Sequence, residues 1–166
     1  MPTVLNDIDA CVFDAYGTLF DVGAAAARCA DALGEHAGAL ASLWRTKQLE
    51  YTWLRSLRGD YVDFWHVTGQ GLDYAMAALD LKDPALRARL MELYLTLDAY
   101  PEVKGTLERL AGGGFQLAIL SNGSPTMLTA AVQNADLTRL LKHVLSVEAS
   151  VSTSPIQAST SSPATG

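Results

Sequence analysis

The sequence predicts an α/β fold, in which a small Rossmann-like parallel sheet of about three strands carries an inserted helical cap subdomain. Two short apolar runs, 8–13 and 115–120, each end at polar residues and a glycine, which is typical of buried parallel strands. Between them, over about 22–97, apolar residues instead recur at helical spacing. A third apolar run at 143–147 follows another helical segment, so crossover connections are expected between the strands.

The first strand is expected over Ile8–Phe13, where Asp9 is the one polar residue. Asp14 ends this run, and the sequence "YGT" follows it directly. Because Gly17 lacks a Cβ atom, the backbone can turn sharply at this point. The sequence thus predicts a carboxylate at the end of a buried strand.

The residues after this turn are expected to form several consecutive helices. Two sets of apolar residues recur three or four positions apart, which predicts that each set shares one helix face. The first set is Leu40, Leu43, Trp44, Tyr51 and Leu54, and the second is Leu86, Leu90, Leu93, Tyr94 and Leu97. We therefore expect an insertion built of helices between the first two strands.

Residues typical of helix ends mark the helices in the second half of the sequence. Asp83 before Pro84 indicates a helix start, and the glycines of "AGGG", 111–114, indicate the end of a helix that carries Val103, Leu107 and Leu110. A further helix is expected over 126–135. The predicted organisation is a core of residues 1–21 and 98–151, a helical cap of 22–97 and a disordered Ser/Thr/Pro-rich tail of 152–166.

Composition limits the classes of partner. The formal net charge of -6 argues against binding to nucleic acid or to an anionic membrane. No apolar run is long enough to span a bilayer, and the N-terminus carries acids where a signal peptide would be basic. Cys11 and Cys29 lie in apolar surroundings and read as packing residues, which fits a cytoplasmic protein. We expect a small-molecule or protein partner.

Two polar residues that end strands are the candidates for chemistry. Ligands of open α/β sheets bind beyond the carboxyl ends of the strands, so Asp14 and Ser121 are expected to converge on one crevice. A carboxylate there can act as a nucleophile, a metal ligand or a base, and Thr18 could orient it by a hydrogen bond. The alternative is an acid that merely caps the next element.

Three motifs give the chain a family resemblance. "FDAYGTLFD" and "LAILSNGSP" resemble motifs of the haloacid dehalogenase superfamily, and "LWRTKQLEYTWLRSL", 43–57, resembles the cap helix of its L-2-haloacid dehalogenase (type II) branch. The motifs stand in the family's order and cover about 7–148. The resemblance implies that Asp14 attacks C2 of an L-2-haloalkanoate, and that water then cleaves the ester to give a D-2-hydroxyacid. It implies no metal and no cofactor.

The identity of residue 16 bears on the choice between two reactions of this superfamily. Relatives that hydrolyse phosphate esters carry a second Asp there, which protonates the leaving oxygen beside a magnesium ion. This chain has Tyr16, whose phenol is a poor general acid at neutral pH, and a halide leaves without a proton. Tyr16 therefore favours carbon-halogen chemistry, with a magnesium-dependent phosphatase as the alternative.

The resemblance also assigns roles to other positions. Arg45 would receive the halide or the substrate charge, although a solvated helix arginine is the alternative. Ser121 and Asn122 would hold the substrate carboxylate, where the alternative is an ordinary turn. Apolar lining around the nucleophile is expected from Tyr16, Leu49 and Phe64, together with Trp53, unless these residues serve only core packing. Thr46 stands where the family has glutamine, and the three histidines have no assigned role.

The resemblance ends after "LSVEA". The family continues with a "YKP" motif and with two more strands that carry an acid, whereas this chain has Ser154 at the lysine position, next to Pro155. The chain therefore resembles a C-terminally truncated member with impaired turnover and an exposed apolar strand edge. The alternative function is that of an inactive remnant that acts by association. A homodimer formed through the cap is expected from the resemblance alone.

Overall fold

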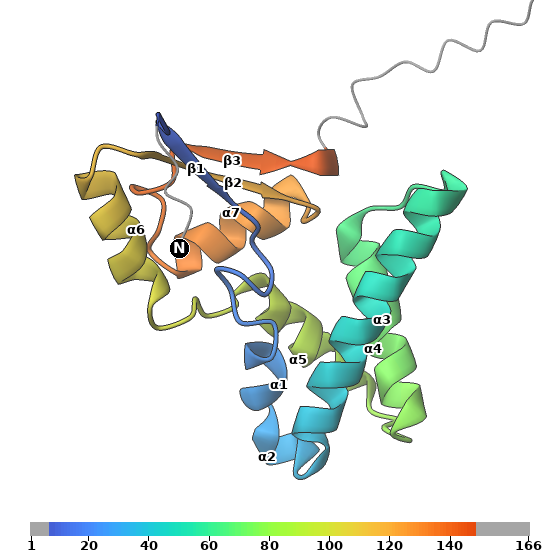
Figure 1. Ribbon diagram of the computed structural model, residues 1–166. Coiled ribbons are helices and arrows are strands. Elements are labelled where there is room, and N and C mark those ends of the chain that lie inside the picture. Colours follow the sequence, from blue (N-terminus) through green and yellow to red (C-terminus); the bar gives the residue numbers. More distant parts are fainter. Residues whose placement is uncertain (1–6, 149–166) are drawn as a thin grey trace, which may run out of the picture.

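The computed structural model describes residues 7–148, and its centre is one parallel sheet (Figure 1). The strands lie in the order β1-β2-β3. Their bounds are β1 Ala10–Phe13, β2 Gln116–Ser121 and β3 His143–Ser146. The predicted strands and their parallel pairing are thus confirmed, although β1 begins two residues later than the apolar run. The tail of 152–166 and Ser154 lie outside the described residues.

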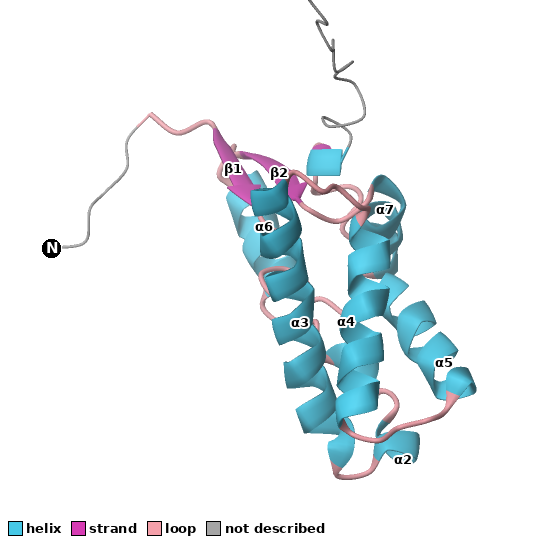
Figure 2. Ribbon diagram, turned by 90° about the vertical axis from the view of Figure 1, so that its right-hand side faces the viewer, coloured by secondary structure: helices cyan, strands magenta, loops and turns pink. Residues whose placement is uncertain are grey.

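Five helices separate β1 from the rest of the core, as the helical spacing predicted. They are α1 Ala24–Ala27, α2 Ala30–Leu33, α3 His36–Arg58, α4 Phe64–Ala78 and α5 Pro84–Leu95. Figure 2 shows the long helices α3 and α4 side by side. The crossovers between strands are α6, Val103–Gly112, and α7, Pro125–Asn134. The fold is therefore a Rossmann-like core with a helical insertion after its first strand.

A side-chain cap starts α5 where the sequence indicated. The Asp83 carboxylate accepts hydrogen bonds from the backbone N–H groups of Ala85 and Leu86, directly before Pro84. Asp63 and Ser124 cap α4 and α7 in the same way. Such caps satisfy N–H groups that have no partner within the helix. The predicted start at Asp83 is thus confirmed.

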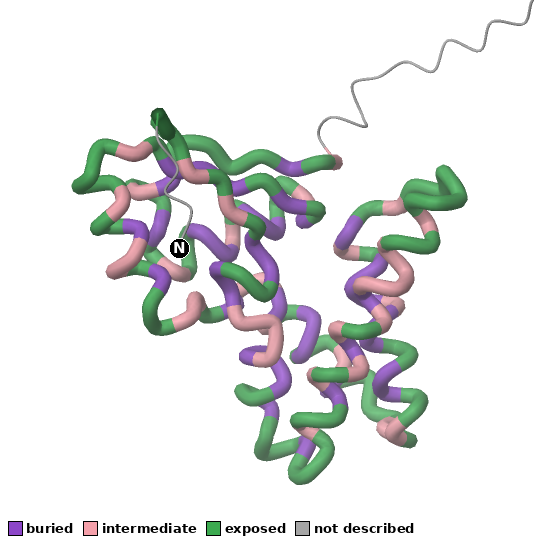
Figure 3. The backbone as a smooth tube through the Cα atoms, viewed as in Figure 1, coloured by how far each residue is buried: buried purple, intermediate pink, exposed green. Residues whose placement is uncertain are grey.

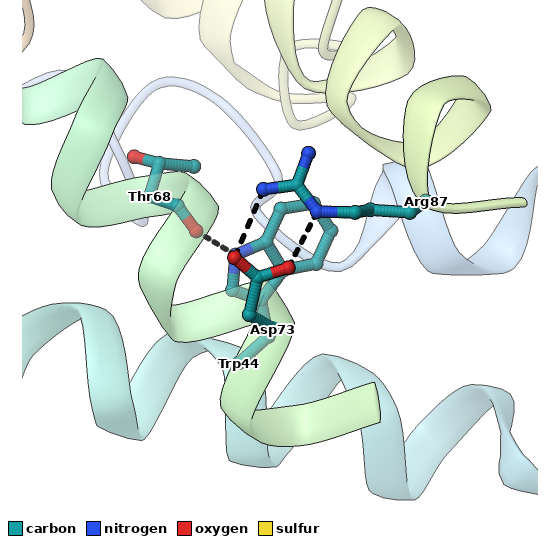
Figure 4. A network of polar contacts seen from close by, with 4 residues as sticks. All are labelled: Trp44, Thr68, Asp73 and Arg87. Carbon is teal, nitrogen blue, oxygen red and sulfur yellow. Dashed lines mark hydrogen bonds and ion pairs between the residues drawn. The ribbon is translucent and has the colours of Figure 1, made fainter. Parts of the chain in front are cut away.

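Polar contacts join the three larger helices of the insertion (Figure 4). The Trp44 indole N–H of α3 donates to the Thr68 carbonyl of α4 over 2.8 Å. The Arg87 guanidinium of α5 pairs with the Asp73 carboxylate of α4, with Nη2 and Oδ2 3.0 Å apart. Since the indole bond is buried, it fixes the register of α3 against α4.

The predicted buried face of α3 is wrong at its C-terminal end, where Leu54 is exposed. The buried positions are Leu40, Trp44 and Gln48, each four residues after the previous one. A row of this kind drifts around the helix axis, and it is the row that packs into the groove of a neighbouring helix. The contact line has therefore rotated away from Leu54 by the last turns of α3.

The two cysteines behave as the composition indicated. Both thiols are free; Cys29 is buried and Cys11 is partly buried. Cys11, a residue of β1, packs against the hydrophobic core. Among the described residues, no helix has the length and apolar character needed to cross a bilayer.

Candidate active site

The two sequence motifs that end β1 and β2 meet in the structure. Phe13 is paired with Ile119 in adjacent parallel strands, so Asp14 and Ser121 follow at the same edge of the sheet. Beyond them, the Tyr16 ring packs against the backbone of Gly123. A Cβ atom at Gly123 would lie 2.6 Å from Tyr16 Cε2, closer than carbon atoms can approach. The glycine of "SNGSP" is therefore required by the tyrosine of "DAYGT".

This contact predicts that Gly123→Ala destabilises the fold by about 2 kcal/mol, because the Tyr16 ring must move or strain. Gly112→Ala is the matched control, since a Cβ there meets nothing within 4 Å. Urea denaturation of the two variants and the parent measures the difference in unfolding free energy. Equal stabilities of Gly123→Ala and Gly112→Ala would contradict the packing described here.

A second glycine lets the cap reach the turn after β1. Gly17 has φ +90°, in the left-handed region that favours glycine, and its N–H donates to the Phe20 carbonyl over 2.9 Å. Arg45, from the middle of α3, extends its guanidinium over this turn. Its Nη2 donates to the Tyr16 carbonyl over 2.7 Å and would lie 3.3 Å from a Cβ at position 17. The Arg45 guanidinium, a permanent cation, is thus bound to the backbone of Tyr16, which follows Asp14 by two positions in the sequence.

Arg45 is itself held by a buried polar network that the sequence analysis missed. Its Nη1 donates to Gln48 Oε1 over 2.9 Å, and Gln48 Nε2 donates to the Thr68 hydroxyl over 2.6 Å. The amide of Gln48 also lies 3.0 Å from the hydroxyl of Tyr94. Because low-dielectric surroundings strengthen such bonds, the network restricts the guanidinium to one position. Gln48 could have been found as a polar residue on the apolar face of α3.

The glutamine that the family resemblance places at position 46 is absent, and Thr46 does not take over its role. The Thr46 hydroxyl donates to the Ser42 carbonyl of its own helix over 2.9 Å, on the exposed side. Gln48 lies one turn after Arg45 and supplies an amide on the buried side instead. The polarity of the site thus comes from position 48.

Aromatic rings surround the Tyr16 side chain. Tyr94 stacks on it at 5.7 Å between ring centroids and 16° between ring planes, and Phe64 lies 5.6 Å away at 38°. The Tyr16 hydroxyl is buried without a hydrogen-bond partner among the described residues. Burial raises its pKa, and the Tyr94 hydroxyl and the Asp14 carboxylate raise it further. Tyr16 is therefore neutral over the whole physiological pH range.

The Tyr94 hydroxyl lies within electrostatic reach of both Asp14 and Arg45. Burial raises the pKa of Tyr94 to about 12, against an opposing effect from the Gln48 hydrogen bond and the Arg45 charge; the Asp14 carboxylate adds a smaller increase. Asp14 and Arg45 thus act on the same hydroxyl with opposite sign. The charges of both residues therefore influence the Tyr94 hydroxyl.

The raised pKa values of Tyr16 and Tyr94 predict that the folded protein loses stability at high pH. A group whose pKa is raised in the folded state favours folding fully below its unfolded pKa, near 10, and loses this contribution as the pH rises through the folded value. From pH 9 to pH 11 we expect the unfolding free energy to fall by roughly 1 kcal/mol on account of Tyr94. Urea denaturation of Tyr94→Phe should show a smaller fall. The exposed Tyr74→Phe is the control, and an equal effect of both would contradict the prediction.

The other predicted site residues are placed as follows. Phe64 is buried and Leu49 is partly buried, whereas Asn122 is exposed just after β2. The Ser121 side chain is buried, and its Oγ accepts the Gly123 N–H over 3.3 Å. Its hydroxyl hydrogen is therefore free to donate to a bound anion.

Three expectations about the nucleophile's surroundings differ from the structure. The Thr18 hydroxyl is exposed and makes no hydrogen bond to Asp14 within the described part of the chain. Asp14 itself is exposed, so the apolar residues do not enclose it. Trp53 is exposed on the outer side of α3, because the buried residues of that helix, Leu40, Trp44 and Gln48, lie on its other side.

A cavity of about 390 Å³ lies beside this region, between the cap and the ends of β2 and β3. Phe64 and Asn122 line it, but Asp14 and Arg45 do not. The Phe64 N–H donates to Glu148 Oε1 over 2.5 Å, which ties α4 to the end of the core. The full lining is Thr52, Arg55, Ser56, Gly59, Tyr61, Val62, Phe64, Val67, Asn122, Val147 and Glu148.

Metal-ligating side chains do not gather in the described part of the chain. No group of three His, Cys, Asp or Glu side chains there could hold an ion. A divalent cation at Asp14 would need further oxygen ligands, such as a second carboxylate at position 16. That position holds Tyr16, whose raised pKa keeps its phenol neutral. Among residues 7–148, Asp14 thus belongs to no group of three such side chains.

Comparison with known proteins agrees with this geometry. The family model of haloacid dehalogenase-like hydrolases matches residues 8–159. The chain belongs to this family. The matched region includes both strand-end motifs and the whole helical insertion. The resemblance inferred from three short motifs is therefore confirmed.

Relatives within the family are similar over most of this chain. It is 47% identical over 146 residues to (S)-2-haloacid dehalogenase 4A of Burkholderia cepacia, covering 87% of this chain and 63% of that protein. It is 46% identical to (S)-2-haloacid dehalogenase of Xanthobacter autotrophicus over 86% of this chain and 56% of that one. The haloacid dehalogenase-like chain thus spans about three fifths of the length of these relatives.

Solved structures show the same fold. A crystal structure of a dehalogenase superposes with a TM-score of 0.85 at 46% identity, over 88% of this chain and 65% of that one. The L-2-haloacid dehalogenase of Xanthobacter autotrophicus with chloropropionic acid covalently bound gives a TM-score of 0.79 at 44% identity, over 87% and 58%. The α/β core with a helical cap is therefore shared with these enzymes.

Proposed function

We propose that this chain displaces halide from L-2-haloacids, with Asp14 as the nucleophile. The observation that carries the proposal is the 2.7 Å hydrogen bond from Arg45 to the Tyr16 carbonyl, which holds a permanent cation beside the Asp14 turn. A cation is needed there because the substrate is an anion and the leaving group is another. The names of the relatives, (S)-2-haloacid dehalogenases, support the same substrate class.

The chemistry follows from these groups. An Asp14 carboxylate oxygen attacks C2 from the side opposite the halogen; the C–O bond forms as the carbon-halogen bond breaks, and halide leaves with the bonding electrons. Water then attacks the carbonyl carbon of the Asp14 ester. This restores the carboxylate, releases one proton and gives the D-2-hydroxyacid. Neither step protonates the halide, so no second acid beside Asp14 is required.

Other residues of the site would bind and orient the substrate. Arg45 would stabilise the departing halide, and the Ser121 hydroxyl with the Asn122 backbone would hold the substrate carboxylate beyond β2. Tyr16, Phe64 and Leu49 would contact the alkyl group, and Thr18 would orient Asp14 once substrate is bound. In this proposal, residues 22–97 are the cap that supplies the cation, and residues 1–21 with 98–151 are the core that supplies the nucleophile.

A stereochemical assay tests the proposal. Chloride release from L-2-chloropropionate and from the D-isomer is measured with the parent chain and with Asp14→Asn. We expect release from the L-isomer alone, and its loss in Asp14→Asn. Absence of chloride release from the parent, even in an amount equal to the protein, would contradict the proposal, as would equal release by Asp14→Asn.

The Gln48 network should set the position of Arg45 during this reaction. Gln48→Met removes the amide at nearly constant volume, and we expect chloride release to slow about tenfold as the guanidinium loses one of its two anchors. Gln48→Glu keeps an oxygen for Arg45 and should recover most of the rate. Gln70→Met is the matched control, because Gln70 binds Arg55 outside the site. A slow Gln48→Glu with an unaffected melting temperature would contradict a positioning role.

A further inference from the structure

Hydrogen bonds join the two long helices of the cap to the core at two points within the described part of the chain. At one point, Arg45 of α3 donates to the Tyr16 carbonyl in the turn after β1. At the other, the Phe64 N–H at the start of α4 donates to the carboxylate of Glu148, which lies two residues after β3. Because β1 and β3 are the outer strands of the sheet, the two bonds anchor the cap at opposite edges of the sheet.

The start of α4 does not need Glu148 in order to form. Asp63 is the N-cap of this helix, and its carboxylate accepts the His66 N–H over 2.7 Å. The Phe64 N–H is one of the first-turn donors that have no partner within the helix, and Glu148 Oε1 accepts it over 2.5 Å. Glu148 is 84 residues away along the chain. Its carboxylate therefore joins the cap to the core and does not serve to start a helix.

The backbone of Glu148 is bound in turn to the loop after β2. The Glu148 N–H donates to Ser146 Oγ over 3.2 Å, and the Ser146 hydroxyl donates to the Gly123 carbonyl over 2.7 Å. Gly123 packs against the Tyr16 ring, and the Phe64 ring lies 5.6 Å from that same ring. These contacts form a closed circuit through the core and the cap. The position of the Glu148 carboxylate therefore bears directly on that of the Phe64 ring.

The Glu148 carboxylate has a second partner in the cap. The Tyr61 hydroxyl donates to it; burial raises the pKa of Tyr61, and the charge and the hydrogen bond of Glu148 raise it further. Both residues line the cavity of about 390 Å³, together with Phe64 and Asn122. Figure 1 shows the end of β3 directed towards the cap, and Figure 3 shows the start of α4 buried and the end of α3 exposed. The bonds to Glu148 thus close one side of this cavity.

We propose that Glu148 is a positioning residue, whose carboxylate holds the first turn of α4 against the core and so fixes the Phe64 ring. The effect on substrate rests on the proposed function, in which Phe64 contacts the alkyl group; the contact itself does not. Loss of the carboxylate frees the first turn of α4, so the substrate is bound less tightly. Asp14 and Arg45 keep their own contacts, so substrate that has bound reacts at the parental rate.

Solvent exchange of the Phe64 amide proton, measured by NMR on the ¹⁵N-labelled chain, tests the contact. A first-turn N–H without a partner is open to solvent, so protection of this proton depends on Glu148. We expect exchange in Glu148→Ala to be at least about tenfold faster than in the parent. Glu148→Gln keeps a side-chain oxygen and should retain most of the protection. The His66 N–H, which Asp63 binds, should exchange equally in all three chains.

Modification of Asp14 by L-2-chloropropionate, followed by intact mass, tests the positioning role. Glu148→Ala is expected to raise the substrate concentration at half-maximal rate about tenfold and to change the rate at saturation by less than about twofold. Glu148→Gln should stay close to the parent. Asp83→Ala is the matched control, because Asp83 caps α5 by the same kind of bond inside the cap. It should leave both the half-maximal concentration and the Phe64 exchange at their parental values.

The two measurements separate this inference from the proposed function. Equal Phe64 exchange in the parent and in Glu148→Ala would overturn the inference, whether or not Asp14 reacts. A slower rate at saturation with an unchanged half-maximal concentration would also overturn it, as would equal effects of Asp83→Ala. An unmodified parent whose Phe64 amide loses protection in Glu148→Ala would contradict the proposed function and support the contact between cap and core.

Discussion

Incubation of the 166-residue chain with L-2-chloropropionate is expected to leave a stable ester on Asp14. Opening such an ester requires an activated water, and the family resemblance assigns that step to a lysine and a later acid. The sequence has Ser154 at the lysine position and a Ser/Thr/Pro-rich tail beyond it. Loss of groups that act as a unit slows a step by about three orders of magnitude or more. Displacement of the halide by Asp14 should therefore be much faster than hydrolysis of the resulting ester.

Intact-mass spectrometry measures this result. We expect a mass increase equal to one substrate without its halogen, located at Asp14 by peptide mapping, and one chloride released for each chain. Asp14→Asn should stay unmodified, and Asp21→Asn, an acid of the same loop outside the site, should react like the parent. Chloride release that continues for many turnovers would contradict trapping of the ester. It would leave the displacement by Asp14 intact.

Arg45→Lys is expected to slow the modification of Asp14 about a hundredfold. The guanidinium uses Nη1 for Gln48 and Nη2 for the Tyr16 carbonyl, so both anchors depend on its planar fork. A lysine ammonium keeps the charge but cannot hold both partners in the same geometry, and a cation displaced from the leaving group stabilises it less. The rate is followed by the fraction of modified chain against time at saturating and at low substrate.

A matched control separates charge from position. Arg55→Lys lies on the same helix, and Arg55 is bound to Gln70 over 2.6 Å beside the cavity and not to the Asp14 turn. We expect Arg55→Lys to react at the parental rate. Equal rates for Arg45→Lys and the parent would show that a charge anywhere on this side of α3 suffices, and would refute the role given to the hydrogen bonds.

The tertiary structure also decided which half of the predicted site is preorganised. Arg45 and Tyr16 are joined by a hydrogen bond between the cap and the core, and Ser121 is buried in its own turn, whereas Asp14 and Thr18 lie exposed at the edge of the sheet. The sequence motifs could not separate these two groups, because a motif lists side chains without their neighbours. Gln48 shows the reverse case, since its role depends on Thr68 and Tyr94 from two other helices.

The sequence by itself determined the local features of this protein: the apolar strands, the helix start at Asp83, the glycines at the two turns and the family. Each depends on residues close together in the chain, where propensity and spacing decide the backbone. Only the tertiary structure decided that α3 buries Gln48 instead of Leu54, that Arg45 binds the Tyr16 carbonyl, and that Glu148 binds the Phe64 N–H. These features depend on how elements far apart in the sequence pack together. The spacing of residues within one element does not specify that packing geometry.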